Sequence, residues 1–156
     1  MFALADDSIN AIIQPMADTV VVDSNVFVAG LKSCDGASRQ VLRLCLQREV
    51  SPIMGHKLFL EFSDVLQRPG LFDSSPSTPA EREALFHGFL AVCQWVNIFF
   101  LWRPNLPDEG DNHVLELAVA GGAAWVITHN VSDFAGELRF PGLQILTPGK
   151  YLRMKK

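Results

Sequence analysis

The sequence predicts an α/β domain in which a parallel sheet is covered by helices on both faces. Apolar segments of strand length alternate along the chain with amphipathic segments of helical spacing, the pattern of strands joined by helical crossovers. Several strand segments are apolar throughout, as expected for strands buried on both faces. A length of 156 residues with 49% hydrophobic residues suits a single domain with a substantial core.

The first half of the pattern starts with the β-branched strand TVVV at 19–22. We expect a turn over SNVFVAGLKSC and then amphipathic helical material over 37–49. The segment VSPIM at 50–54 is expected to form a short second strand. A helix should follow over 57–68, because its apolar residues recur at helical spacing and a Pro-Gly pair comes directly after it.

A polar segment rich in Pro and Ser, residues 71–79, is expected to be a loop. It closes on a capping-box pattern in which Thr78 precedes Glu81 by three positions and Pro79 stands at the first helical position. A helix is therefore predicted over 79–93.

Three further strands complete a sheet of about five. They are expected at VNIFFLW (96–102), AAWVIT (123–128) and LQILT (143–147). Between the first two of these, HVLELAVAG has the character of a helix that ends at the pair Gly121 and Gly122. We expect residues 19–152 to form one domain, with residues 1–18 as an N-terminal extension that has apolar residues at helical spacing.

Composition narrows the setting. No apolar run reaches the roughly 18 residues of a membrane span, and the N-terminus lacks the pattern of a signal peptide, so we expect a cytoplasmic protein without membrane association. The net charge of −4 does not indicate a nucleic-acid-binding protein. Divalent cations bound by the acids would nevertheless determine the electric field that a phosphate meets at that point. Cys34, Cys45 and Cys93 are odd in number and widely spaced. They are expected to be core or near-core thiols rather than disulfide or zinc residues.

The segment PDEGDN at 107–112 crowds Asp108, Glu109 and Asp111 together, although like charges raise the cost of ionising one another. One interpretation is a helix start, in which these acids meet the positive end of the helix dipole. The other is a metal site.

The order of strands and acids favours the metal site. Asp23 directly follows the first strand, residues 103–111 follow the fourth, and His129 to Asp133 follow AAWVIT. Because ligands of such sheets lie beyond the carboxyl ends of the strands, these segments should meet at one edge. Glu61 would join them from the border of a helix's apolar stripe, where a carboxylate is costly without a cation. The position of Glu61 on the helix is explained equally well if its side chain simply reaches solvent.

Four stretches of the chain resemble the PIN-domain ribonucleases, particularly the VapC-like branch of toxins from bacterial toxin-antitoxin pairs. The resemblance covers nearly everything after residue 18. The matching stretches are VVDSNVFVAGL, SPIMGHKLFLEFSDVLQRPGL, PDEGDNHVLELAVAGGAAWVITHNVSDF and ILTPGKYL.

The resemblance implies a three-layer α/β/α fold and a Mg²⁺ or Mn²⁺ site that cleaves RNA to leave a 5′-phosphate and a 3′-hydroxyl. Gly110 stands where relatives often have another Asp, and Asn130 stands where some relatives carry an acid. The fourth metal-facing acid is therefore either Asp108 or Asp133. Carried over by position, the site comprises Asp23, Glu61, Asp111 and Asp133, with Asp108 as a further metal candidate and Ser24, Asn25, Thr128 and Asn130 as polar support.

The chemistry suits these residue types, because Mg²⁺ and Mn²⁺ prefer oxygen ligands and activate water for attack on a phosphodiester. The histidines show no ligand spacing and are not expected to be catalytic, although His129 could touch substrate. The expected partners are single-stranded RNA, a cognate antitoxin and further copies of the chain in a homodimer or higher oligomer. Phosphate contacts are expected from Arg39, Arg43, Arg68 and Arg103.

Other functions fit the sequence less well. A haloacid-dehalogenase-type phosphatase needs a second Asp two positions after Asp23, where Asn25 stands. A response-regulator receiver needs paired acids after the first strand and a Lys after a later one, and neither arrangement is present. A PIN-like scaffold that binds RNA or protein without cutting stays open, because Gly110 and Asn130 are consistent with a weakened site.

Overall fold

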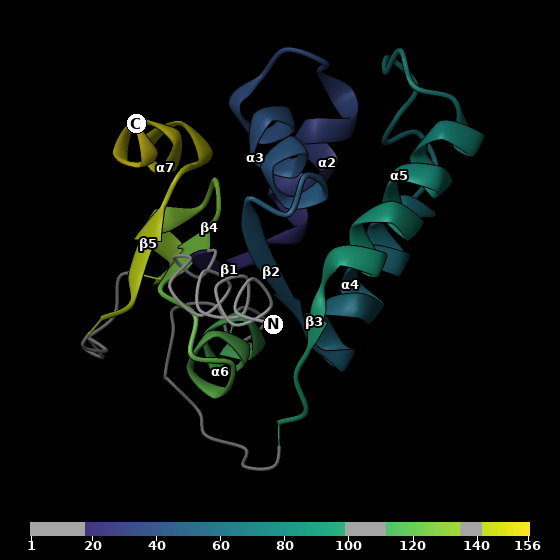
Figure 1. Ribbon diagram of the computed structural model, residues 1–156. Coiled ribbons are helices and arrows are strands. Elements are labelled where there is room, and N and C mark those ends of the chain that lie inside the picture. Colours follow the sequence, from purple (N-terminus) through teal and green to yellow (C-terminus); the bar gives the residue numbers. More distant parts are fainter. Residues whose placement is uncertain (1–17, 99–111, 135–141) are drawn as a thin grey trace, which may run out of the picture.

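The computed structural model describes residues 18–98, 112–134 and 142–156, and its centre is a five-stranded sheet (Figure 1). All neighbouring strands pair in parallel, in the order β3-β2-β1-β4-β5. The parallel α/β class expected from the sequence is therefore confirmed. The strands are β1 (Asp18–Val22), β2 (Val50–Met54), β3 (Gln94–Trp95), β4 (Trp125–Ile127) and β5 (Gln144–Leu146).

Helices cover both faces of the sheet and make it the middle of three layers. On one side α6 packs on β1, β2 and β4, whereas α3 and α5 contact β2 and α7 contacts β5 (Figure 1). The helices are α2 (Ser24–Lys32), α3 (Ala37–Leu46), α4 (His56–Leu66), α5 (Pro79–Val92), α6 (Asn112–Ala120) and α7 (Pro148–Lys155), with a 3-10 turn, η2, at Val131–Phe134.

The core fixes the helices that carry the candidate site residues. Phe27 of α2 stands 5.1 Å from Phe62 of α4 and 5.4 Å from Phe89 of α5, measured between ring centroids. All three rings are buried, and aromatic pairs at such distances add to the free energy gained from burial. The start of α2, which follows β1, is thereby held against α4.

The capping box at the start of α5 forms as the sequence predicts. Thr78 Oγ1 accepts a hydrogen bond from the Glu81 backbone N–H at 3.2 Å, and the Glu81 carboxylate accepts one from the Thr78 N–H at 3.0 Å. Pro79 occupies the first turn, where a missing N–H costs nothing. The helix α6 ends at Ala120, and Gly122, two residues later, adopts a left-handed φ of 65°. Glycine tolerates this conformation without strain.

The turn expected over SNVFVAGLKSC is wrong, because α2 begins at Ser24, directly after β1. Ser and Asn near its start suggest a turn, but Asp23 caps the helix with its own side chain, which makes those residues the first turn of a helix.

The fourth strand also differs from the expectation. The structure places β3 at Gln94–Trp95, leaves 96–98 outside any helix or strand, and does not describe 99–102. Cys93 is already extended after α5, so pairing with β2 begins earlier than the apolar run suggests. Both β3 residues are exposed, which hides this edge strand from a search for hydrophobic segments.

Two smaller observations complete the fold. Cys45 is buried and Cys93 is half-buried, as expected, but Cys34 is exposed, because it lies in the connection between α2 and α3 rather than under the sheet. Within the described ranges, no helix is long and apolar enough to span a membrane.

Candidate metal centre at the carboxyl edge of the sheet

Asp23 occupies the point where β1 ends and α2 begins. Its backbone is extended, with φ −69° and ψ 153°, and its Oδ1 accepts a hydrogen bond from the Ser24 N–H at 2.8 Å. This is the geometry of an N-cap, in which a carboxylate satisfies a donor at the start of a helix. The residue is only 4% exposed, so the carboxylate is held largely away from bulk water.

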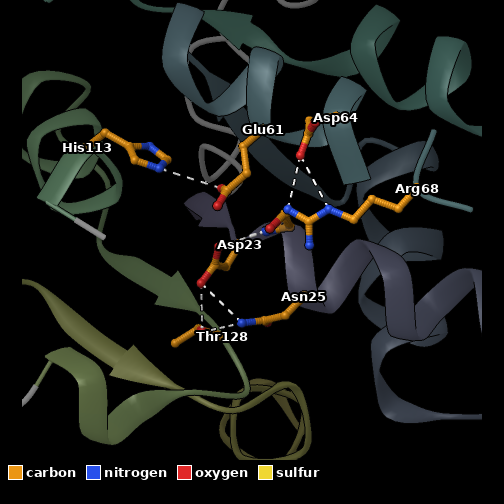
Figure 2. Close-up of polar contacts among 8 residues, drawn as sticks. Asp23, Asn25, Glu61, Asp64, Arg68, His113 and Thr128 are labelled. Atoms are coloured by element: carbon orange, nitrogen blue, oxygen red, sulfur yellow. Dashed lines mark hydrogen bonds and ion pairs between the residues drawn. The ribbon is translucent and has the colours of Figure 1, made fainter. Parts of the chain in front are cut away.

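A second strand end holds the other oxygen of the same carboxylate (Figure 2). Thr128, fully buried directly after β4, donates its Oγ1 hydrogen to Asp23 Oδ2 at 2.9 Å. Asn25 Nδ2 donates to the same Oδ2 at 3.3 Å and to Thr128 Oγ1 at 3.2 Å. The β1–β4 register aligns Val22 with Ile127, so pairing of the two strands itself brings Asp23 and Thr128 together.

The protonation of Asp23 reflects two opposing effects. Burial raises the pKa of the Asp23 carboxyl above its ordinary value of 3.8, whereas hydrogen bonds from Thr128, Ser24 and Asn25 and the nearby His113 ring lower it. Burial has the larger effect, so the ionised form is under-compensated by the described residues. A bound cation at this edge would supply the missing compensation.

Glu61 approaches from α4 and meets a residue of α6. The Glu61 Oε2 and His113 Nε2 atoms are 3.6 Å apart, with side chains 33% and 13% exposed, and Figure 2 shows the ring and the carboxylate facing each other. Burial lowers the pKa of His113, and attraction to Asp23 opposes this only in part. His113 is therefore close enough to both acids to interact with each electrostatically.

Polar contacts continue from this centre to its rim. The His129 backbone N–H donates to Asn25 Oδ1 at 3.1 Å, and the Asn130 N–H donates to Thr128 Oγ1 at 3.1 Å. The His129 ring is hydrogen-bonded to Ser38 of α3, with 2.8 Å between Nε2 and Oγ. The chain after β4 is thus fixed against the first turns of α2 and α3.

The structure brings together several of the residues expected at this site, whereas for others the expected metal-binding or phosphate-binding role stays a prediction. Asp23, Ser24, Asn25 and Thr128 share one hydrogen-bonded group, and Asn130 joins it through its backbone. Asp133 lies in η2, where its metal-facing role stays a prediction. The expected ligands Asp108 and Asp111 and the phosphate contact Arg103 lie outside the described residues.

A metal cluster is not complete within the described ranges. Among residues 18–98, 112–134 and 142–156, no group of three or more His, Cys, Asp or Glu side chains stands close enough to hold an ion. The helix α6 begins at Asn112, the residue that follows Asp111 in the sequence, and His113 is its second residue.

The three described arginines expected to contact RNA make contacts within the chain. Arg39 donates to the Gly30 carbonyl at 3.0 Å, and Arg43 reaches the Cys34 carbonyl at 3.4 Å. Arg68 pairs with Asp64, one helical turn before it, at 3.0 Å (Figure 2). Exposed pairs of this kind contribute little stability, so the Arg68 guanidinium remains available to exchange partners.

His129 was expected at this edge as a residue that could touch substrate, whereas the sequence patterns did not place His113 or Ser38 there. His113 lacks ligand spacing to another histidine, but the sequence places it directly after the acid-rich segment PDEGDN. The Ser38–His129 contact joins residues 91 positions apart. No local pattern in the sequence reveals a pair at that separation.

Comparison with known proteins agrees with the geometry. The chain has the fold seen in the crystal structure of VapBC2 from Rickettsia felis bound to a DNA fragment from their promoter, with 13% identity, a TM-score of 0.56, and coverage of 81% of this chain and 96% of that one. No curated protein matches the sequence closely. A family model described as PIN domain matches residues 19–132, and the chain therefore belongs to the PIN domain family.

Proposed function

We propose that the protein is a metal-dependent endoribonuclease that hydrolyses phosphodiester bonds of single-stranded RNA. The observation that carries this proposal is the buried carboxylate of Asp23, held at the carboxyl edge by donors from the first turn of α2 and from Thr128, directly after β4. Membership of the PIN domain family, whose members are generally nucleases, supports the reaction class.

The described residues fit a hard divalent ion. Three donors reach the Asp23 carboxylate, which has roughly four acceptor positions, so its oxygens retain room for about one further contact. Carboxylate oxygens suit Mg²⁺ and Mn²⁺, which bind proteins through few carboxylates and keep several waters. The residues that would hold the ion are Asp23, Glu61 and Asp111, with Asp108 or Asp133 as a fourth acid.

Each group of the chain has a defined task in this proposal. A bound Mg²⁺ or Mn²⁺ supplies Lewis-acid chemistry that makes water a better nucleophile and offsets charge on the phosphodiester. Thr128 and Asn25 fix Asp23 Oδ2, so the carboxylate meets its ligand in one orientation. Arg68, freed from Asp64, would contact an RNA phosphate without reading the base sequence. No side chain forms a covalent bond to the substrate.

We further propose that the protein is the toxin of a type II toxin-antitoxin pair in the cytoplasm, neutralised by a cognate antitoxin and active as a homodimer or higher oligomer. Similarity in fold to the toxin-antitoxin structure from Rickettsia felis supports this partner. The second candidate is a PIN scaffold that binds RNA or protein without cutting. The incomplete cluster among the described residues and the residues Gly110 and Asn130 keep that candidate in view.

The test is cleavage of labelled single-stranded RNA with Mn²⁺ or with excess chelator. We expect cleavage only with metal, and Asp23→Asn or Glu61→Gln should lower the rate at least about 10²-fold by removing a ligand or its charge. The matched control is Glu83→Gln, because Glu83 is an exposed acid on α5 that lies outside the proposed site. Its cleavage rate should stay close to that of the wild type.

Two outcomes would count against the nuclease. Equal cleavage in excess chelator would show that the reaction does not depend on a divalent metal. RNA binding without cleavage in any divalent metal, unchanged by Glu61→Gln, would favour the binding scaffold instead.

A further inference from the structure

The contact between α4 and α6 joins a proposed metal ligand to a residue with no assigned role. His113, the second residue of α6, faces Glu61 with 3.6 Å between Nε2 and Oε2. Figure 2 shows the ring directed at the carboxylate from the α6 side of the site. Both side chains are mostly withdrawn from water, so the contact is not one of many interchangeable surface pairs.

The two ring nitrogens have different surroundings. Nε2 points to the carboxylate, whereas Nδ1 is buried and has no hydrogen-bond partner in the part of the chain that the structure describes. A buried N–H without an acceptor is rarer in proteins than an acceptor without a donor. The tautomer with its proton on Nε2 therefore fits these surroundings better, and it places a donor opposite Glu61.

The separation of 3.6 Å is slightly longer than an ordinary N–H···O hydrogen bond. Catalytic hydrogen bonds are often long before ligands bind and tighten afterwards. A small rotation of the long Glu61 side chain would close the gap. Oε2 would then accept the imidazole N–H.

We propose that His113 positions Glu61 for the metal, by fixing one carboxylate oxygen so that the other faces the ion. This inference rests on the proposed function, because it assumes that Glu61 is a ligand. A hydrogen bond that holds the Glu61 carboxylate in one orientation lowers the entropic cost of binding an ion.

A direct nitrogen ligand is the alternative role for the same ring. The 3.6 Å separation is shorter than the sum of typical metal–nitrogen and metal–oxygen distances, about 4.1 Å for zinc, so one ion could touch both atoms. The oxygen-rich donor set favours positioning, because hard ions take oxygen before imidazole nitrogen.

The test measures Mn²⁺ binding to the full-length, tag-free protein by electron paramagnetic resonance, in which the signal of free Mn²⁺ falls as the ion binds. We expect His113→Leu to raise the Mn²⁺ Kd about 10- to 100-fold, the usual effect of losing a residue that orients a ligand. His113→Gln, which keeps an amide N–H near the position of Nε2, should bind within about 3-fold of the wild type. The control His87→Leu, on the exposed face of α5, should leave the Kd unchanged.

Pulsed measurements on the Mn²⁺-bound wild type separate the two roles of the ring. Positioning predicts no directly coordinated histidine nitrogen. Should His113→Leu fail to fold, His113→Asn is the substitute, because its amide is too short to reach Glu61 and should weaken binding in the same way.

Each contrary result has a distinct meaning. An unchanged Kd in His113→Leu, or a directly coordinated nitrogen that the substitution removes, would overturn the positioning role and leave the proposed function standing. A wild-type protein that binds no Mn²⁺ would overturn this inference and the metal-dependent nuclease together.

Discussion

The Asp23 carboxylate is held by three neighbouring residues that do not fully compensate its negative charge. Its carboxylate accepts hydrogen bonds from Ser24, Asn25 and Thr128, each of which favours the ionised form. Burial nevertheless raises its pKa, so these bonds do not fully replace the lost water. A residue that costs stability in the folded chain is typical of a functional position.

The first residue-scale prediction concerns pH. In the unfolded chain the Asp23 carboxyl ionises near 3.8, and in the folded protein it ionises at higher pH. Between these two values the folded state binds more protons than the unfolded state, so the free energy of unfolding falls as pH rises. The fall is complete above the folded-state pKa. Asp23→Asn removes this titration, and in chelator the variant should gain stability relative to the wild type as pH rises through the window.

Urea unfolding of both proteins at intervals from about pH 4 to about pH 7 measures the difference in free energy. Taking the difference cancels any constant cost of exchanging a carboxylate oxygen for an amide. Asp64→Asn, which alters an exposed acid, serves as the control. A difference that stays flat or falls with pH would show that Asp23 is not the under-compensated carboxylate described above.

At the scale of elements, the sequence predicted correctly those helix ends and strands that depend on neighbouring residues in the chain. The capping box of α5, the strand β2 and the end of α6 all lie where their residue patterns predict. The start of α2 was missed because Ser24 and Asn25 suggest a turn, whereas Asp23 caps the helix with a side chain that Thr128, directly after β4, also holds. The strand β3 was missed because its two residues are exposed at the edge, where hydrophobicity carries no signal.

The α5 cap gives a prediction about the fold that does not depend on the site. Thr78→Ala removes the hydroxyl that accepts from the Glu81 N–H and should lower the free energy of unfolding by about 1 kcal/mol. Chemical denaturation measures the loss, with exposed Glu83→Gln as the control. Mn²⁺ affinity and RNA cleavage should be unaffected. A loss of metal binding in Thr78→Ala would mean that α5 is coupled to the centre in a way that these contacts do not explain.

At the scale of the whole molecule, the site depends on sheet order more than on any motif. The β1 strand is central, with β2 and β4 as its neighbours, so the residues that follow these strands meet at one edge. The sequence could predict this convergence because parallel strands end on the same side. It could not predict that His113 would face Glu61 or that Ser38 would hold His129, since those contacts depend on how separate helices pack.

The central claim is that the acids at this edge of the sheet bind a divalent ion. Substitution of Asp111 tests this claim most directly. The residue precedes α6, so it has two competing roles. If it only meets the helix dipole, Asp111→Asn should lower stability by roughly 0.3 to 1 kcal/mol with or without metal. If it faces Asp23 and Glu61, neutralising it relieves repulsion without metal and weakens binding when metal is present.

The measurement is four melting curves, of the wild type and Asp111→Asn, each with chelator and with millimolar Mn²⁺ at about pH 7.5. A metal site predicts that the variant melts at or above the wild type in chelator. It also predicts that Mn²⁺ raises the melting temperature of the wild type more than that of the variant, because stabilisation grows with affinity. If Asp111→Asn lowers the melting temperature equally in both conditions, Asp111 is a helix-start residue and the metal site as described here is wrong.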